Sequence, residues 1–476
     1  MEAVPIAVFW IALALAACRP RHVSIHLFFA TMPFGSFAVI PTELTGGLTL
    51  TPTPVVASML VGRELLAPGG PARALVLALK PSGLLYLSQF WLVAGIATVF
   101  MPRLYGGAVE VIPVRPAGLV SAAMLAPSAQ NLSQFVYVTI SVLAVFAFAR
   151  LLRSERDRLH AMQALCLGAG IAIASGILDF SSKFVPVQPL LDAFRTASYT
   201  LMTDNEILDS RRVVGLMPEA SSYGALLLCF LPALYFFRRA MPAGMLRDRI
   251  VPLQCCALLV LVWLSTSSSA YLGLAAFAAV AVAEWTWRFL AARRNPLLRR
   301  GIATEFCAGL AVAATILLLL IAVPRVFSPL VEMLDVMVFQ KSNSSSFEER
   351  SLWNTVSWNA LWATGGLGVG LGGTRASNFA IAVASNAGIV GAALYFTFVL
   401  RCLFFGKAPH ADVRGQAILS ACRCAYVPAF LAILTVGTTP DFGLFNAFLY
   451  GFAVAVAVGP QVQPRRRPQI GRWHAR

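Results

Sequence analysis

The sequence predicts an all-α fold, a polytopic transmembrane helix bundle, from three observations. Hydrophobic residues make up 58% of the chain and charged residues only 12%, which is about half the charged fraction of an ordinary soluble domain. Apolar runs near 20 residues long, enough to cross a hydrocarbon core of about 30 Å, recur along the whole chain. The basic residues are distributed between these runs in the manner of membrane topology signals.

The apolar runs predict about 12 or 13 membrane-spanning helices, with the lipid bilayer as their solvent. No linker separates them, so residues 1–476 are expected to form a single integral membrane domain. The first run ends at Cys18 in a sequence that matches a lipoprotein cleavage site. The absence of a basic segment before it favours a first transmembrane helix instead. The predicted spans are 5–18, 23–42, 45–62, 82–101, 132–149, 161–179, 216–237, 250–265, 268–287, 303–324, 378–400, 416–435 and 441–459.

The loop charges predict which side each connection faces, because short cytoplasmic loops accumulate Lys and Arg. Five connections together hold 21 basic and 4 acidic residues and are expected inside. Segments 180–215 and 325–377 each hold 4 basic and 4 acidic residues, and they are expected outside. The net charge of +16 is therefore explained by topology and does not indicate a nucleic-acid partner. The five inward segments are 150–160, 238–249, 288–300, 401–414 and 464–476.

The first outward segment, 180–215, leads into a candidate site. Arg211 and Arg212 are candidate substrate-binding residues, and Pro218-Glu219 follows at the start of an apolar span. Glu219 has two interpretations. It is either a catalytic base beside a region of low dielectric constant, or a carboxylate stabilised simply by its place at a helix N-terminus.

The second outward segment, 325–377, contains Arg350, the main catalytic candidate. Ser346-x-x-Glu349 fits a capping box, which predicts a helix from about Phe347 with Arg350 in its first turn. Free backbone N–H groups and a guanidinium group at such a place suit a phosphate or pyrophosphate. The alternative is that Arg350 only forms a local ion pair with Glu348 and Glu349.

Tryptophans and glycines follow Arg350. Trp353, Trp358 and Trp362 predict a helix along the membrane surface, which either supports a lipid headgroup beside Arg350 or only anchors the loop.

Gly366, Gly368 and Gly370 are candidate substrate-binding residues, since glycine permits close backbone approach to a ligand. The alternative is that these glycines allow the chain to turn tightly into the next span. Gly368, Gly370 and Gly373 have the spacing G-x-G-x-x-G, but they lack the preceding strand that a nucleotide site requires.

At these residues the chain resembles the O-antigen ligase and polysaccharide polymerase family. The resemblance rests on Arg212 through Gly224, on the serine-rich turn 265–269, and on Arg350 through Gly391. Within the last block, Arg350 and Gly366 stand in the relation R-x15-G. The resemblance covers the second half of the chain, whereas the first half shares only hydropathy with the family.

The resemblance implies an enzyme of the bacterial inner membrane that transfers glycans outside it. The donor would be an undecaprenyl-pyrophosphate-linked oligosaccharide, the acceptor a second glycan, and a chain-length regulator is a further candidate partner. The family implies neither a cofactor nor a metal. Arg211 or Arg212 together with Arg350 would bind the pyrophosphate, with Glu219 as the candidate base.

Three functions remain open at this point. Ligases of the family use a histidine in the large outward loop, and this sequence has none there, which favours a polymerase over a ligase. A secondary transporter or flippase would place its charges near the bilayer midplane, whereas the predicted spans are nearly free of charge. The five histidines, all inward or near spans, are His22, His26, His160, His410 and His474.

Overall fold

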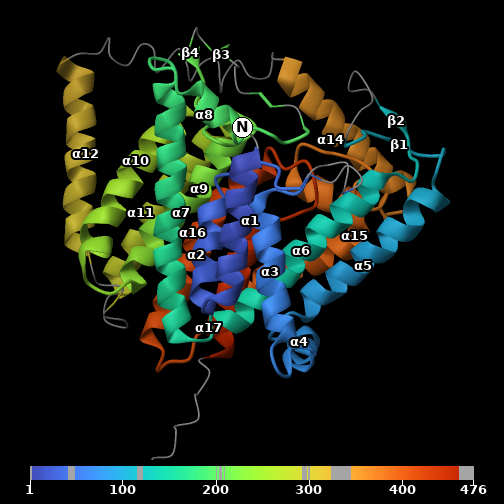
Figure 1. Ribbon diagram of the computed structural model, residues 1–476, viewed down its shortest axis with the longest axis horizontal. Helices are drawn as coiled ribbons and strands as arrows, with labels where there is room; N and C mark the ends of the chain where they lie inside the picture. Colours follow the sequence, from blue (N-terminus) through green and yellow to red (C-terminus); the bar gives the residue numbers. More distant parts are fainter. Residues whose placement is uncertain are drawn as a thin grey trace, which may run out of the picture.

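A computed structural model of the chain confirms the all-α bundle (Figure 1). It describes residues 3–40, 45, 49–114, 122–199, 201–202, 206–207, 210–291, 297, 301–322 and 345–459. The helices are α1 (Ala3–Cys18), α2 (Arg21–Thr31), α3 (Pro52–Leu66), α4 (Gly70–Leu79), α5 (Leu85–Leu104), α6 (Ala129–Leu151), α7 (Glu155–Ser181), α8 (Gln188–Asp192), α9 (Ala220–Phe237), α10 (Val251–Leu264), α11 (Ser268–Ala291), α12 (Ile302–Ala322), α14 (Ser345–Ala363), α15 (Phe379–Val399), α16 (Val413–Leu434) and α17 (Leu444–Val458). Two small antiparallel hairpins complete the described structure: β1 (Glu110–Val111) with β2 (Ala123–Met124), and β3 (Glu206–Ile207) with β4 (Ser210–Arg211).

Seven helices in the described part of the chain are long and apolar enough to cross a membrane, so the protein is a multi-pass membrane protein. They are α5, α6, α7, α9, α11, α15 and α16. Most of the other predicted spans are shorter helices of 11 to 16 residues, namely α1, α2, α3, α10 and α17. Hydropathy overestimates span length here because an apolar run also fits a helix buried among other helices.

Helix α17 shows this clearly, since it lies in the core of the bundle. Every residue from Phe445 to Val456 is buried, so the helix is apolar on all sides because all sides meet protein. Its Phe448 packs edge-on against Phe29 of α2 and Phe148 of α6. A side chain at Gly451 would clash with Phe148, which shows how closely α17 and α6 approach.

The two ends of the bundle carry different elements. Figure 1 shows α8, α14 and both hairpins at one end, which we call the outward end after the charge prediction, and α4 at the opposite, inward end. At the inward end, Arg158 lies 2.7 Å from Asp412, and Arg414 contacts Glu155. These pairs join segments 150–160 and 401–414, two of the segments that their charge predicts to face the same side.

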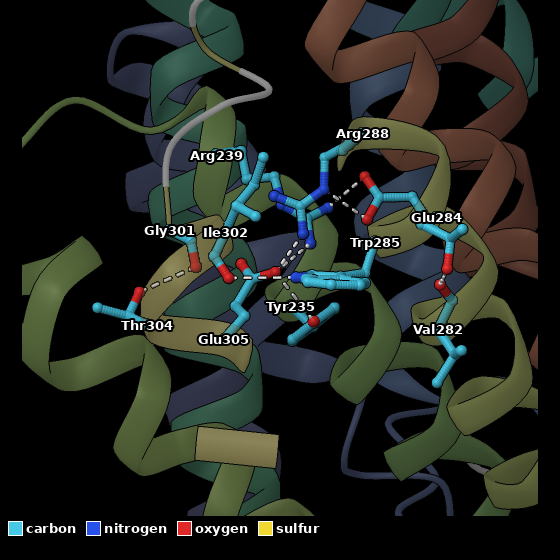
Figure 2. A network of polar contacts seen from close by, with 11 residues as sticks. Tyr235, Arg239, Val282, Glu284, Trp285, Arg288, Gly301, Ile302, Thr304 and Glu305 are labelled. Atoms are coloured by element: carbon cyan, nitrogen blue, oxygen red, sulfur yellow. Dashed lines mark hydrogen bonds and ion pairs between the residues drawn. The ribbon is translucent and has the colours of Figure 1, made fainter. Parts of the chain in front are cut away.

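A buried network of charges ties α9, α11 and α12 together near the inward end. Figure 2 shows Arg239, Glu284, Arg288 and Glu305 pointing toward one another. Glu284 accepts hydrogen bonds of 2.8 Å from both Arg239 and Arg288, and Glu305 contacts the same two arginines. Two cations thus balance two carboxylates inside the bundle, which allows Glu284 to lie within a predicted span.

Replacing Arg288 with alanine is expected to destabilise the protein by about 3–5 kcal/mol, because it leaves two buried carboxylates with one arginine. The side chain of Arg288 is 0% exposed. Thermal unfolding of the detergent-solubilised protein measures the effect. Arg247→Ala is the matched control, since the Arg247–Asp248 pair lies nearer the surface and its loss should cost much less. Equal losses in the two variants would contradict a structural role for the network.

Candidate functional site

The candidate site lies at the outward end and comprises residues from three parts of the chain. These are the segment that enters α9, the helix α14, and the loop from α14 to α15. The site contains Arg212, Glu219 and Arg350, which the sequence predicts, and also Arg375.

The Asp179 carboxylate fixes the first of these parts. Asp179 lies in the last turn of α7, and its Oδ2 accepts hydrogen bonds from the backbone N–H groups of Val214 (2.7 Å) and Gly215 (3.1 Å). Its Oδ1 is 3.0 Å from Nη2 of Arg195, which also donates to the Gly215 carbonyl at 3.1 Å. Both charged side chains are nearly fully buried, at 1% and 4% exposure. These hydrogen bonds and this ion pair fix the position of the chain between Arg212 and Glu219.

Arg212 is held by the turn between α10 and α11. Its Nε donates to the Ser265 carbonyl (3.2 Å) and to Oγ1 of Thr266 (3.0 Å), and its Nη2 donates to the Thr266 carbonyl (2.9 Å). The serine-rich turn 265–269, one of the three blocks behind the family resemblance, therefore positions a candidate residue. No hydrogen bond in the described structure uses Nη1 of Arg212, so this atom can donate to a ligand.

Glu219 occupies the N-cap position of α9, but its side chain does not cap the helix. Instead Oε1 accepts hydrogen bonds from the hydroxyl groups of Ser221 and Ser222. The predicted location at a helix start is confirmed. The hydroxyl groups orient the carboxylate, and its role as a base stays a prediction.

Arg350 lies in α14, as predicted, and the structure describes this helix from Ser345. The expected capping box of Ser346 and Glu349 lies outside the described side chains. The described residues form no hydrogen bond or ion pair with Arg350, so the alternative of a local ion pair with Glu348 or Glu349 is not observed.

Arg375 is the functional candidate that sequence analysis missed. Its guanidinium group stacks on the buried indole ring of Trp353, 3.6 Å from the ring centroid. Its backbone N–H donates to the Ile112 carbonyl (2.9 Å), and its own carbonyl accepts from Oγ of Ser357 (2.9 Å). Its Nε is buried without a hydrogen-bond partner. The available signal was its charge, since it is one of the four basic residues in segment 325–377.

The electrostatics show that these groups are close to one another. Burial lowers the pKa of Arg212; Glu219 opposes the shift and Arg350 adds to it. Burial likewise lowers the pKa of Arg375, with Glu349 and Glu219 opposing and Arg350 adding. Glu219 and Arg350 therefore interact electrostatically with both of the other arginines.

The outward arginines differ from the buried arginines at the inward end. Arg158, Arg239 and Arg288 each form an ion pair with a carboxylate. Arg212, Arg350 and Arg375 form none with the residues that the structure describes. Their positive charge is thus available to an external anion, and planar guanidinium groups match phosphate oxygens in pairs.

The predicted glycines lie beside this group and make backbone contacts within the protein. Helix α15 is broken at Gly388, which has a φ of 75°, and the glycine loop packs into the break. The N–H of Gly370 donates to the Asn386 carbonyl (3.0 Å), and the Gly366 carbonyl accepts from Ile389 (2.9 Å). The N–H of Gly368 donates to Oγ1 of Thr364 (3.0 Å). These contacts favour the second interpretation of the glycines, a tight re-entry into the next span, while substrate contact stays a prediction.

The three tryptophans of α14 have different surroundings. Trp353 is buried against Ile112 and Val356, whereas Trp358 and Trp362 are 45% and 55% exposed. Two indole rings thus face away from the protein, as expected for a helix at a membrane surface.

Two parts of the predicted site lie outside the described structure. Arg211 pairs through its backbone with Glu206 in the β3–β4 hairpin, but its side chain is not among the described groups. Residues 325–344 of the large outward segment are likewise outside the described ranges.

The described histidines include a cluster far from the candidate site. The His22 and His160 rings stack with centroids 4.3 Å apart, and His26 lies beside them. His160 and Asp179 are separated by 19 residues of α7, roughly 28 Å at about 1.5 Å per residue. The cluster therefore cannot supply a base to the outward site.

No known family model matches this chain, and no curated protein shows significant sequence similarity to it.

Changing Gly368 to alanine tests the structural role of the glycine loop. A Cβ at Gly368 (φ +82°) would lie 2.6 Å from the Gly388 nitrogen, whereas Gly365 (φ +61°) has nothing within 4 Å of an added Cβ. Both alanine variants should lose about 1–2 kcal/mol from the left-handed backbone. Gly368→Ala should lose about 1–3 kcal/mol more from the clash. Thermal unfolding measures both, and equal losses would rule out the tight packing.

Proposed function

We propose that this protein is a polysaccharide polymerase that transfers glycan repeats from an undecaprenyl-pyrophosphate-linked donor on the outer side of the bacterial inner membrane. One observation carries the proposal. Arg212, Arg350 and Arg375 have no carboxylate partner among the described residues, and Arg212 and Arg375 both interact electrostatically with Glu219 and Arg350. The resemblance of blocks 212–224 and 350–391 to the polymerase and ligase family supports the same function.

The chemistry of the donor explains the need for several arginines. When the glycan is transferred, the bond between its anomeric carbon and the phosphate oxygen breaks, and the diphosphate leaves with the electron pair. Fixed donors that face this growing negative charge stabilise the transition state more than the ground state. In this scheme Arg350 and Arg375 donate to the diphosphate, and the stacking of Arg375 on Trp353 fixes its orientation before the donor binds.

The acceptor side needs a group that takes a proton. The acceptor hydroxyl forms the new bond to the anomeric carbon and loses its proton, which Glu219 accepts in this scheme. The hydroxyl groups of Ser221 and Ser222 hold the carboxylate in place.

The membrane supplies the remaining requirement, a place for the lipid part of the donor. The exposed rings of Trp358 and Trp362 lie on the same helix as Arg350. A polyprenyl chain in the bilayer and a diphosphate at its boundary would therefore reach the arginines without leaving the interface. The distance of the His22–His160 cluster from this end favours a polymerase over a histidine-dependent ligase.

Arg350→Ala is expected to lower elongation of an undecaprenyl-pyrophosphate oligosaccharide by about 100-fold or more, the effect of removing one preorganised transition-state donor. Arg350→Lys should recover little of the elongation activity, because a single ammonium group does not replace the several coplanar N–H donors of a guanidinium group. Polymer formed by the purified protein is the measurement.

Arg103→Ala is the matched control for the Arg350 variants. Arg103 is exposed near the end of α5, and its side chain contacts the carbonyl of Val99 in its own helix. Its loss should leave elongation unchanged. Full activity of both Arg350 variants would remove Arg350 from the mechanism. Transport of the lipid-linked glycan without polymer from the unmodified protein would favour a flippase.

A further inference from the structure

A cationic cavity lies at the inward end of the bundle. It has a volume of about 200 Å³ and is formed where α3, α4 and α6 meet. Five cationic side chains surround it, against a single carboxylate. These charged residues are Arg21, Arg73, Lys80, Arg150, Arg153 and Glu64.

The carboxylate of Glu64 balances only part of this charge. It lies 3.3 Å from Arg21 and 3.3 Å from Arg150. Arg73, Lys80 and Arg153 form no ion pair with the residues that the structure describes. The cavity therefore keeps an excess of positive charge that no described protein group neutralises.

An apolar cavity of about 280 Å³ adjoins the cationic one and shares Glu64 and Arg150 with it. Hydrophobic side chains of α3, α4 and α6 form the rest of its wall. They include Val61, Leu65, Leu75, Ala78, Leu143 and Phe146. The two cavities together are cationic at one side and apolar at the other.

The short helix α4 places both cavities at a membrane boundary. Leu75, Val76 and Leu79 of α4 are 60%, 53% and 63% exposed, although they belong to a helix at the inward end (Figure 1). Exposed leucines next to arginine and lysine are typical of a helix that lies in the interface between headgroups and acyl chains.

We propose that these two cavities bind one anionic phospholipid of the inner leaflet. Its phosphate lies among Arg73, Lys80 and Arg153, and one acyl chain lies along the apolar wall formed by α3, α4 and α6. The cationic cavity is large enough, since about 200 Å³ corresponds to roughly seven water molecules at about 30 Å³ each. An anionic headgroup is favoured because a zwitterionic one brings no net charge to balance the cations.

Lipid binding to the delipidated, detergent-solubilised protein tests this assignment. The probes are phosphatidylglycerol, phosphatidylcholine and glycerol 3-phosphate, with bound lipid counted by native mass spectrometry. Phosphatidylglycerol should bind about fivefold or more tightly than phosphatidylcholine, and glycerol 3-phosphate should not displace it. Equal affinity for the two lipids would overturn the proposal. Displacement by glycerol 3-phosphate would also overturn it, because the ligand would then be a soluble phosphate.

Two matched lysine variants test whether lipid binding depends on this site or only on the positive charge of the surface. Lys80→Gln should lower phosphatidylglycerol affinity about fivefold, which corresponds to about 1 kcal/mol for one basic residue. Lys407→Gln, at another exposed inward position, should leave it unchanged. Ala78→Phe, which fills the apolar cavity, should weaken binding of both lipids. Equal effects of Lys80→Gln and Lys407→Gln, or unchanged binding by Ala78→Phe, would contradict the assignment.

Discussion

The buried carboxylate of Asp179 is the constraint on which the outward end depends. It receives two backbone N–H groups and one guanidinium group, and these bonds determine where the chain leaves α7 and enters α9. The hydrogen bonds of Arg212 to Ser265 and Thr266 also hold this segment. A buried carboxylate is stable only when its oxygen atoms accept enough hydrogen bonds. The Asp179 carboxylate therefore needs the loop at this position, and the loop is held there by the same hydrogen bonds.

The distribution of arginine partners separates structural charges from functional ones. At the inward end, Arg158, Arg239 and Arg288 are matched by carboxylates, whereas the half-buried Arg423 donates to the carbonyls of Leu403 and Gly406. At the outward end, Arg195 is matched in the same way by Asp179. Arg212, Arg350 and Arg375 are left unmatched in the described structure, although burial of Arg212 and Arg375 is costly enough to lower their pKa values. Partly buried cations without carboxylates are candidates for binding an anionic ligand, and this is the basis of the proposed function.

Composition alone was sufficient to predict the fold class, because few charges and many apolar runs have no other stable arrangement. The location of Arg212, Glu219 and Arg350 at the same end of the bundle was predicted from topology, because both outward segments had to reach the same side. The number of spans could not be obtained in this way, since α17 is as apolar as a lipid-exposed helix and is buried by protein. Arg375 and Asp179 were missed because their roles depend on contacts that are distant in sequence. Arg375 stacks on Trp353, and Asp179 accepts a hydrogen bond from the backbone of Val214.

A double-mutant cycle with Arg350→Gln and Arg375→Gln, measured as binding of undecaprenyl pyrophosphate to the purified protein, tests most directly whether the outward guanidinium groups share one anion. If both groups contact the same diphosphate, the two losses of binding free energy will differ from additivity by more than about 0.5 kcal/mol. A cycle of Arg350→Gln with Arg103→Gln should be additive. Additive losses for Arg350 and Arg375, or no loss in either variant, would contradict a common diphosphate site.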